Sequence, residues 1–279
     1  MLCYESSIPV FPLRVKSTAH IQVHRSTVWQ TLVVTTTTGL RARLRAEITQ
    51  EIKDEARRQM AEEGASSLSL RAIARQLGMV SSGIYRYFKS RDDLLTALIV
   101  DAYEGLAIAV EAADMHCERG DFTGRWSACC HAVRSWARAH PAEYSLIYGS
   151  PVPGYRAPEE TNSPASRVAL ALVAVVHDAA TAGALRPPFL PDLRPPLSER
   201  AAAEAARLTA VGFSGVPEGT VTRALVAWTQ LFGAVSFEVF GRFTGIVEDV
   251  DAVFDQSVLE ISAFVGFVQP MTGATQPSN

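Results

Sequence analysis

The stretch that decides the fold runs from Ser69 to Arg91 and reads "SLRAIARQLGMVSSGIYRYFKSR". Ser69 is a favoured residue for capping the start of a helix, and the apolar residues after it recur at helical spacing. Gly78 then supplies the backbone freedom that ends a helix in a tight turn. A second helix is expected over residues 81–88, with two apolar residues four apart on its buried side. Two short helices joined in this way form a helix-turn-helix, whose last helix enters the major groove of DNA.

The side chains on the outer surface and rim of this motif are suited to DNA. Hydroxyl groups and cations bind phosphate oxygens, and an arginine near a helix start reaches a base edge or a phosphate. Other roles stay open for some of them. Arg71 also fits a solvated surface position, Tyr85 also fits packing against the helix that follows, and Ser81, Ser82 and Gly83 also fit a helix start. The candidate DNA-binding residues are Ser69, Arg71, Ser81, Ser82, Gly83, Tyr85, Arg86, Tyr87, Lys89 and Arg91.

Helical periodicity extends outward from this stretch in both directions. A helix is expected over residues 40–63, where apolar residues recur every four positions and Gly64 follows. Proline-rich connectors separate the later segments, and neither an internal repeat nor a convincing pair of strands occurs. The fold class is therefore predicted as all-α. The later helices are expected at about 92–117, 123–139, 141–149, 164–182, 198–210, 218–241 and 250–268.

Composition divides the chain into a basic front and an acidic rear. Eleven basic and eight acidic residues lie in 41–100, against twelve basic and twenty acidic in 101–279. This asymmetry favours a front part that meets a polyanion. The predicted domains are a disordered extension at 1–37, a DNA-binding head at 38–92, a helical domain at 93–269 and a disordered tail at 270–279.

Several other classes of protein are disfavoured by the sequence. The longest apolar run, Val168 to Val176, is far shorter than the roughly 20 residues of a membrane span, and no secretory signal is found at the N-terminus. Four cysteines without a CxxC pattern give neither a disulfide framework nor a metal site. No GxSxG, P-loop or Rossmann glycine pattern indicates an enzyme. We expect a cytoplasmic protein without metal, cofactor or membrane contact.

The residues from Gly64 to Ile99, "GASSLSLRAIARQLGMVSSGIYRYFKSRDDLLTALI", resemble the DNA-binding region of the tetracycline-repressor (TetR) family of bacterial regulators. Three departures occur: Tyr87 stands where the family has His, Arg91 where it has Lys, and the glycine of the turn is displaced to Gly83. The segments "WARAHPAEYSLIYGSPVPGY" and "WTQLFGAVSFEVFGRF" are similar to ligand-domain and dimerisation segments of one branch. Within the stretch from Gly64 to Ile99, the residues that match the pattern of the family are Gly64, Ser69, Ile73, Ala74, Gly78, Ile84, Tyr85, Phe88, Arg91 and Leu94.

This resemblance implies a helix-turn-helix head followed by a larger helical domain for effector binding and dimerisation. Such a protein would be a homodimeric repressor, released from a palindromic double-stranded DNA operator by a small-molecule effector. Aromatic residues that could line an effector cavity, or simply form core, are Trp126, Trp136, Tyr144, Tyr148 and Trp228.

The helices expected at about 218–241 and 250–268 are apolar on nearly all sides. This pattern predicts that they are buried on all sides, on one side against the core and on another against a second subunit. Two core helices of a monomer would give the same pattern. The candidate dimerisation residues are Leu225, Phe232, Gly233, Phe237, Phe240, Ile261 and Val265.

Two other functions stay open at this point. One is a constitutive or architectural DNA-binding protein without an effector. The other is an enzyme or ligand carrier with a vestigial head, which would bind no DNA even at low salt.

Overall fold

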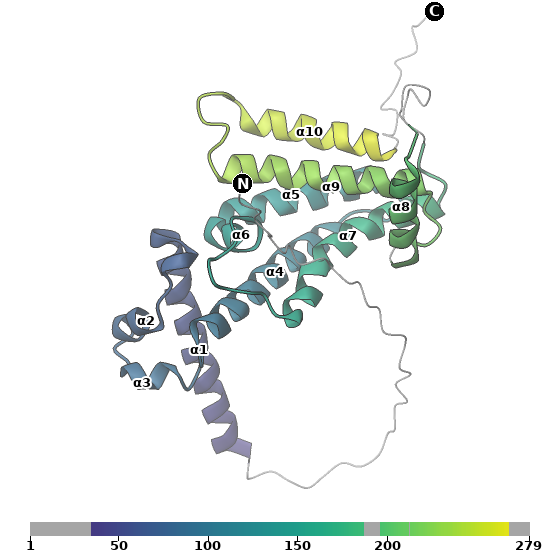
Figure 1. Ribbon diagram of the computed structural model, residues 1–279. Helices are drawn as coiled ribbons and strands as arrows, with labels where there is room; N and C mark the ends of the chain where they lie inside the picture. Colours follow the sequence, from purple (N-terminus) through teal and green to yellow (C-terminus); the bar gives the residue numbers. More distant parts are fainter. Residues whose placement is uncertain (1–34, 187–195, 212, 268–279) are drawn as a thin grey trace, which may run out of the picture.

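The computed structural model describes residues 35–186, 196–211 and 213–267 (Figure 1). Within those ranges the chain forms α-helices, two 3-10 turns and an isolated bridge between Leu185 and Phe267, with no strand. The predicted all-α class is confirmed. The helices are α1 (Thr35–Glu63), α2 (Leu70–Gln76), α3 (Ser81–Ile84), α4 (Arg91–Met115), α5 (Phe122–Ala139), α6 (Pro141–Tyr148), α7 (Asn162–Thr181), α8 (Glu199–Val211), α9 (Glu218–Val239) and α10 (Val250–Val265), with η1 (Ala65–Ser67) and η2 (Glu159–Thr161).

The turn between α2 and α3 has the geometry that its sequence predicts. The Ser69 hydroxyl accepts a hydrogen bond from the backbone N–H of Ala72 at 3.4 Å and so caps α2. Gly78 lies in the left-handed region at φ 65°, and the N–H of Met79 donates to the Ala74 carbonyl at 2.8 Å. The first bond satisfies a free N–H at the start of α2; the second satisfies a carbonyl near its end, where the chain turns toward α3.

Some boundaries differ from the prediction. Helix α1 begins at Thr35, whereas the predicted disordered extension runs to residue 37; the rest of that extension and the predicted tail lie outside the described residues. Helix α3 ends at Ile84, not at 88, and the chain continues in turns, in which the N–H of Arg86 bonds the Gly83 carbonyl at 3.2 Å and the N–H of Tyr87 bonds the Ile84 carbonyl at 2.9 Å. That three-residue spacing tightens the last turn beyond α-helical geometry.

Two separate hydrophobic cores organise the molecule. The head core is built by α1, α2, α3 and the first two turns of α4, and the body core by the rest of α4 together with α5, α7, α9 and α10. The predicted boundary at residue 92 therefore falls at the start of a helix that both cores share. The buried residues of the head core are Ile52, Ala56, Met60, Leu68, Leu70, Ile73, Ala74, Ile84, Phe88, Leu94, Leu95 and Leu98.

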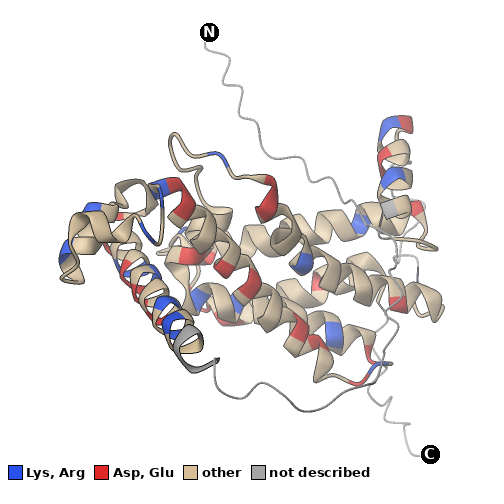
Figure 2. Cartoon of the chain, turned by 90° about the horizontal axis from the view of Figure 1, so that it is seen from below, with Lys and Arg blue, Asp and Glu red and all other residues tan. Residues whose placement is uncertain are grey.

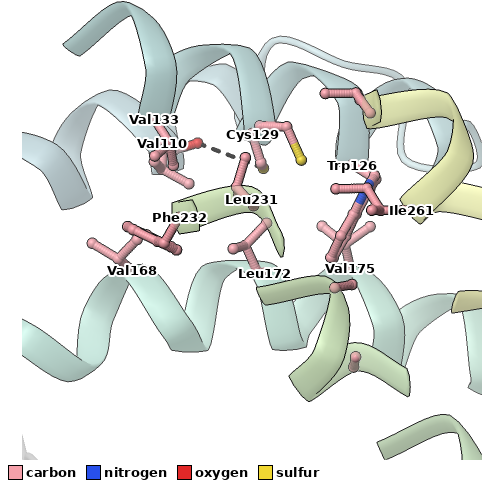
Figure 3. Packing of buried hydrophobic residues seen from close by; sticks show 14 of the residues in the cluster. Val110, Trp126, Cys129, Val133, Val168, Leu172, Val175, Leu231, Phe232 and Ile261 are labelled. Carbon is pink, nitrogen blue, oxygen red and sulfur yellow. Dashed lines mark hydrogen bonds between the residues drawn. The ribbon is translucent and has the colours of Figure 1, made fainter. Parts of the chain in front are cut away.

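The body is layered, with α9 and α10 running side by side along one edge and α8 at the end away from the head (Figure 1). Figure 3 shows Trp126 and Cys129 of α5 facing Leu172 of α7 and Leu231 of α9 in the body core. Arg134 of α5 ties the outer helices to this core. Its guanidinium is buried and donates to Glu238 of α9 at 2.7 Å and also to Asp251 of α10. No helix in the described ranges is both long and apolar enough to cross a membrane.

Candidate nucleic-acid interface

The outer face of α3 and the turn after it carries polar side chains free of the head core. Ile84 is fully buried and Phe88 is 8% exposed, so the two apolar residues predicted to face inward pack in the head core. Hydroxyl and cationic groups point away from the core and are accessible to a phosphate backbone. DNA contact by these side chains stays a prediction. The exposed candidates are Arg71, Ser81, Ser82, Tyr85, Arg86 and Lys89.

Two small candidates have structural roles in the motif. The Ser69 hydroxyl is used in the helix cap described above. Gly83 lies in the first turn of α3, where a Cβ atom would meet the Val80 side chain at 3.3 Å. A larger residue at this position would press on the segment that leads into α3.

Arg91 has a different environment from the one predicted. Its guanidinium donates to the carbonyls of Leu68 at 3.1 Å, Ala65 at 3.0 Å and Ser66 at 3.1 Å. The side chain thus joins the start of α4 to the η1 segment, and its donors face protein carbonyls. These three contacts serve the fold of the head, because Nε and Nη2 are directed into protein carbonyls. A phosphate contact by Arg91 stays a prediction.

Tyr87 also turns toward the protein. Its half-buried ring packs on the head core, and the Arg45 guanidinium lies 5.2 Å from the ring centroid. Arg45 also donates to the Arg86 carbonyl at 2.8 Å, which places this part of α1 beside the segment that follows α3.

The sequence reasoning missed the basic start of α1. Arg41, Arg43 and Arg45 are exposed, and Figure 2 shows basic residues clustered at this end of the helix. The "RARLR" run was a usable signal, but only the contact from Arg45 to the segment after α3 brings it to the candidate interface. These cations extend the surface available to phosphates beyond the helix-turn-helix.

Val80 was missed because it is apolar. It stands directly before α3 and is 73% exposed, while its neighbours in the head core are buried. An exposed apolar side chain at the start of a recognition helix is suited to the methyl group of thymine.

The aromatic candidates of the body fall into separate groups. Tyr144, Tyr148 and Trp228 come together through Phe232, with ring centroids 5.1 Å apart for Tyr144–Tyr148, 4.5 Å for Tyr148–Phe232 and 4.7 Å for Trp228–Phe232. We call these four residues the aromatic cluster. Burial raises the pKa of Tyr144 to about 12 against the opposing hydrogen bond with Ser236, and burial raises the pKa of Tyr148 well above its usual range. The cluster is therefore uncharged at neutral pH.

The other two aromatic candidates lie elsewhere. Trp136 stacks on His140 at a centroid distance of 4.8 Å, and Trp126 packs on Phe267 at 5.4 Å. Both tryptophans are buried. The structure thus brings together three of the five predicted ligand-binding residues.

The candidate dimerisation residues divide between the core and the surface. Phe232, Ile261 and Val265 are buried in the body core, so they are corrected to intrasubunit packing residues. The apolar pattern alone did not indicate which side of each helix faces inward. Leu225 and Phe237 are exposed, as is part of Phe240.

An apolar outer face remains on α9 and α10. A Cβ atom added at Gly233 would meet nothing within 4 Å. A groove of about 370 Å³ runs between the two helices, lined by residues that include Ala234 and Val253. We call this surface the α9–α10 face; its large exposed apolar residues are Leu225, Val226, Phe237, Val253 and Leu259.

Metal-ligating groups do not converge in the part of the chain that the structure describes, where no cluster of three His, Cys, Asp or Glu side chains could hold an ion. Cys117, Cys129 and Cys130 are free thiols. Burial raises the pKa of Cys129 to about 12, so this thiol is neutral and unreactive.

Replacing Arg86 by glutamine should flatten the salt dependence of operator binding. One lost phosphate contact lowers the slope of log K against log salt by about 0.9. Titrations of operator DNA across a range of salt concentrations measure it. Arg200→Gln is the matched control, since Arg200 is an exposed arginine on α8. An unchanged slope in Arg86→Gln would show that this face does not meet the DNA backbone.

Comparison with known proteins gives consistent matches across both parts of the chain. Residues 52–98 match the family model described as "Bacterial regulatory proteins, tetR family", and residues 126–261 match "Tetracyclin repressor-like, C-terminal domain". The chain is 41% identical over 223 residues to the HTH-type transcriptional regulator Rv1816 of Mycobacterium tuberculosis, covering 78% of this chain and 92% of that one.

Solved structures agree with these matches. The crystal structure of the regulatory protein SCO4313 aligns with a TM-score of 0.64 at 36% identity, over 79% of this chain and 97% of that chain. PfmR, a TetR family transcriptional regulator from Thermus thermophilus, aligns with a TM-score of 0.52 at 16% identity, over 78% and 99% of the two chains, and shares the fold.

Proposed function

Because the chain belongs to the TetR family of bacterial transcriptional regulators, we propose that this DNA-binding protein is a homodimeric repressor that a small-molecule effector releases from its operator. The observation that carries the proposal is the sharing of α4 between two cores. A polar helix-turn-helix face lies on one side of this helix, and the body with its exposed α9–α10 face lies on the other. Any change in the body that moves α4 also moves the head.

The proposed partner of the α9–α10 face is a second copy of the chain. Large apolar side chains stay exposed there, and the open space beside Gly233 allows another helix to approach closely. A twofold axis along this face pairs α9 and α10 with their symmetry mates. Two heads related by twofold symmetry read a palindromic operator, one half-site each.

The proposed coupling element is α6, a short helix that contacts both cores. Ala142 and Leu146 pack against the head core, while Tyr144 and Tyr148 belong to the aromatic cluster. The Tyr144 hydroxyl lies 3.0 Å from the hydroxyl of Ser236 on α9. An effector that binds between the rings of the aromatic cluster and separates them would therefore shift α6 relative to the head.

Charged contacts also join the head to the body, at the point where α1 meets α4 and α6. Arg57 of α1 donates to Asp101 of α4 at 2.9 Å and lies 3.5 Å from Glu143 of α6. Lys53 pairs with Asp101 at 2.8 Å. Ligand binding shifts an equilibrium only through a difference in affinity between two conformations. A few exposed or half-buried ion pairs can be exchanged for others at modest cost, so this junction is suited to such a change.

The neutral character of the aromatic cluster favours an apolar, aromatic effector. Its phenols stay protonated, and Trp228 and Phe232 add apolar rings beside them. Small-molecule sites in general take their affinity from buried apolar area and a few oriented polar groups.

Selection of bound fragments from genomic DNA tests the proposed function. We expect enrichment of one or a few palindromic sites. Val80→Ala should relax the preference for thymine at one position in each half-site, because the methyl contact is lost. A selection that enriches no sequence would contradict the proposal. Enrichment of sites without twofold symmetry would contradict the dimer.

A further inference from the structure

A cleft of about 520 Å³ lies between the head and the body, apart from the aromatic cluster. Ala65 and Ser66 of η1 form its head wall. Ser145, within α6, and Ser150, in the loop after it, belong to the body. Phe240 and Arg242, in the segment after α9, close it from a third side. Figure 1 shows how the end of α1, α6 and the end of α9 converge there.

The lining of this cleft has one charge and several free hydrogen-bonding groups. Among the described residues, Arg242 is the only charged one that lines the cleft, and its guanidinium has neither an ion pair nor a hydrogen bond with them. The hydroxyls of Ser66, Ser145 and Ser150 also lack protein partners there. Val152 and Phe240 supply apolar surface beside them.

This combination defines a chemical class of ligand. An arginine without a carboxylate partner binds a carboxylate or phosphate through paired hydrogen bonds. Hydroxyls donate to the same anion, and the apolar surface accepts a hydrocarbon or aromatic group. The volume lies in the usual range for small-molecule sites.

The head wall of the cleft is connected to the DNA-binding segment. The carbonyls of Ala65 and Ser66 accept hydrogen bonds from Arg91, which follows directly after that segment. The opposite walls belong to the body. A ligand that contacts both walls fits only one spacing of head and body, and its binding must depend on the position of the head.

We propose that this cleft is a regulatory site for a small amphipathic anion, which Arg242 binds through its carboxylate or phosphate group. The site goes beyond the effector proposed above, and it rests on the proposed function only because operator binding is one of its readouts. Linkage requires that ligand and operator change each other's affinity by the same factor.

The test compares two probes of the same shape, 2-naphthoate and 2-naphthamide, which differ in charge. Calorimetric titration of the full chain should show at least tenfold tighter binding of the naphthoate. Arg242→Gln should remove this difference, Arg242→Lys should retain part of it, and Arg200→Gln, at an exposed arginine of α8, should bind as wild type. Saturating naphthoate should change the dissociation constant of a genomically selected operator at least threefold in wild type, and not in Arg242→Gln.

Equal affinity for the two probes, or wild-type affinity in Arg242→Gln, would overturn the site. Tight naphthoate binding that leaves operator affinity unchanged would overturn its regulatory role. The probe titrations need no DNA, so they are independent of the proposed function. Absence of operator binding by the protein without probe would count against the proposed function instead.

Discussion

Replacing Gly233 by leucine is expected to convert the proposed dimer into monomers and to remove operator binding. The glycine has open space around its Cβ position within the subunit, so leucine should leave the monomer fold intact. Where a partner helix approaches closely, overpacking costs about 1–3 kcal/mol per site. A twofold interface presents the change twice, for a loss of about 2–6 kcal/mol of association free energy. A monomer keeps one head and loses the second half-site.

Light scattering at micromolar concentration, together with an operator titration, measures both effects. Gly120→Leu is the matched control, because Gly120 also has open space around its Cβ position and lies between α4 and α5. This control should remain a dimer with full operator affinity. If Gly233→Leu did the same, the partner would have to bind another surface.

Replacing Arg91 by glutamine is expected to destabilise the head without flattening the salt dependence of DNA binding. The guanidinium donates to three carbonyls of the segment between α1 and α2. Hydrogen bonds from a charged group contribute about 1.5–3 kcal/mol. Operator affinity should therefore fall for all sequences alike, through loss of head structure, while the number of phosphate contacts stays the same.

Thermal unfolding and the salt titration distinguish this role from a phosphate contact. Arg91→Lys should recover only part of the stability, because one ammonium group cannot span the carbonyls of Leu68 and Ala65 as the guanidinium does. Arg86→Gln should show the opposite pattern, with an unchanged melting temperature and a flatter slope. If Arg91→Gln had a wild-type melting temperature and a flatter salt dependence of operator binding, Arg91 would be a phosphate-contacting residue.

The sequence predicted most of the helices because their signals are local. Pro141 marks the start of α6 directly after α5, and the structure ends α5 at Ala139. The cap at Ser69 and the turn at Gly78 likewise depend on residues within one helical turn. Such features are set by neighbours in the chain and survive folding unchanged.

Features set by distant residues were beyond the sequence. Phe232 and Phe237 lie on one helix and are equally apolar, yet the first is buried and the second is 55% exposed. Only the packing of α9 against the rest of the body decides between them. Arg91 finds its carbonyl partners in a segment more than twenty residues earlier in the chain. Its charge suggested DNA, and only the folded structure reveals these protein contacts.

The sharing of α4 limits how such regulators can exchange parts. Leu94, Leu95 and Leu98 belong to the head core, although they follow the predicted boundary at residue 92. Ala102 and the residues after it belong to the body core. A recombination event that joined a new head at residue 92 would leave it with three foreign side chains in its interior. A crossover between Leu98 and Ala102 keeps the buried residues of each core together, so that a new head meets foreign side chains only at its contact with α6 and the loop after it. The matching family model of the head also ends at residue 98. Heads and bodies can thus be inherited separately only if the break falls inside a continuous helix.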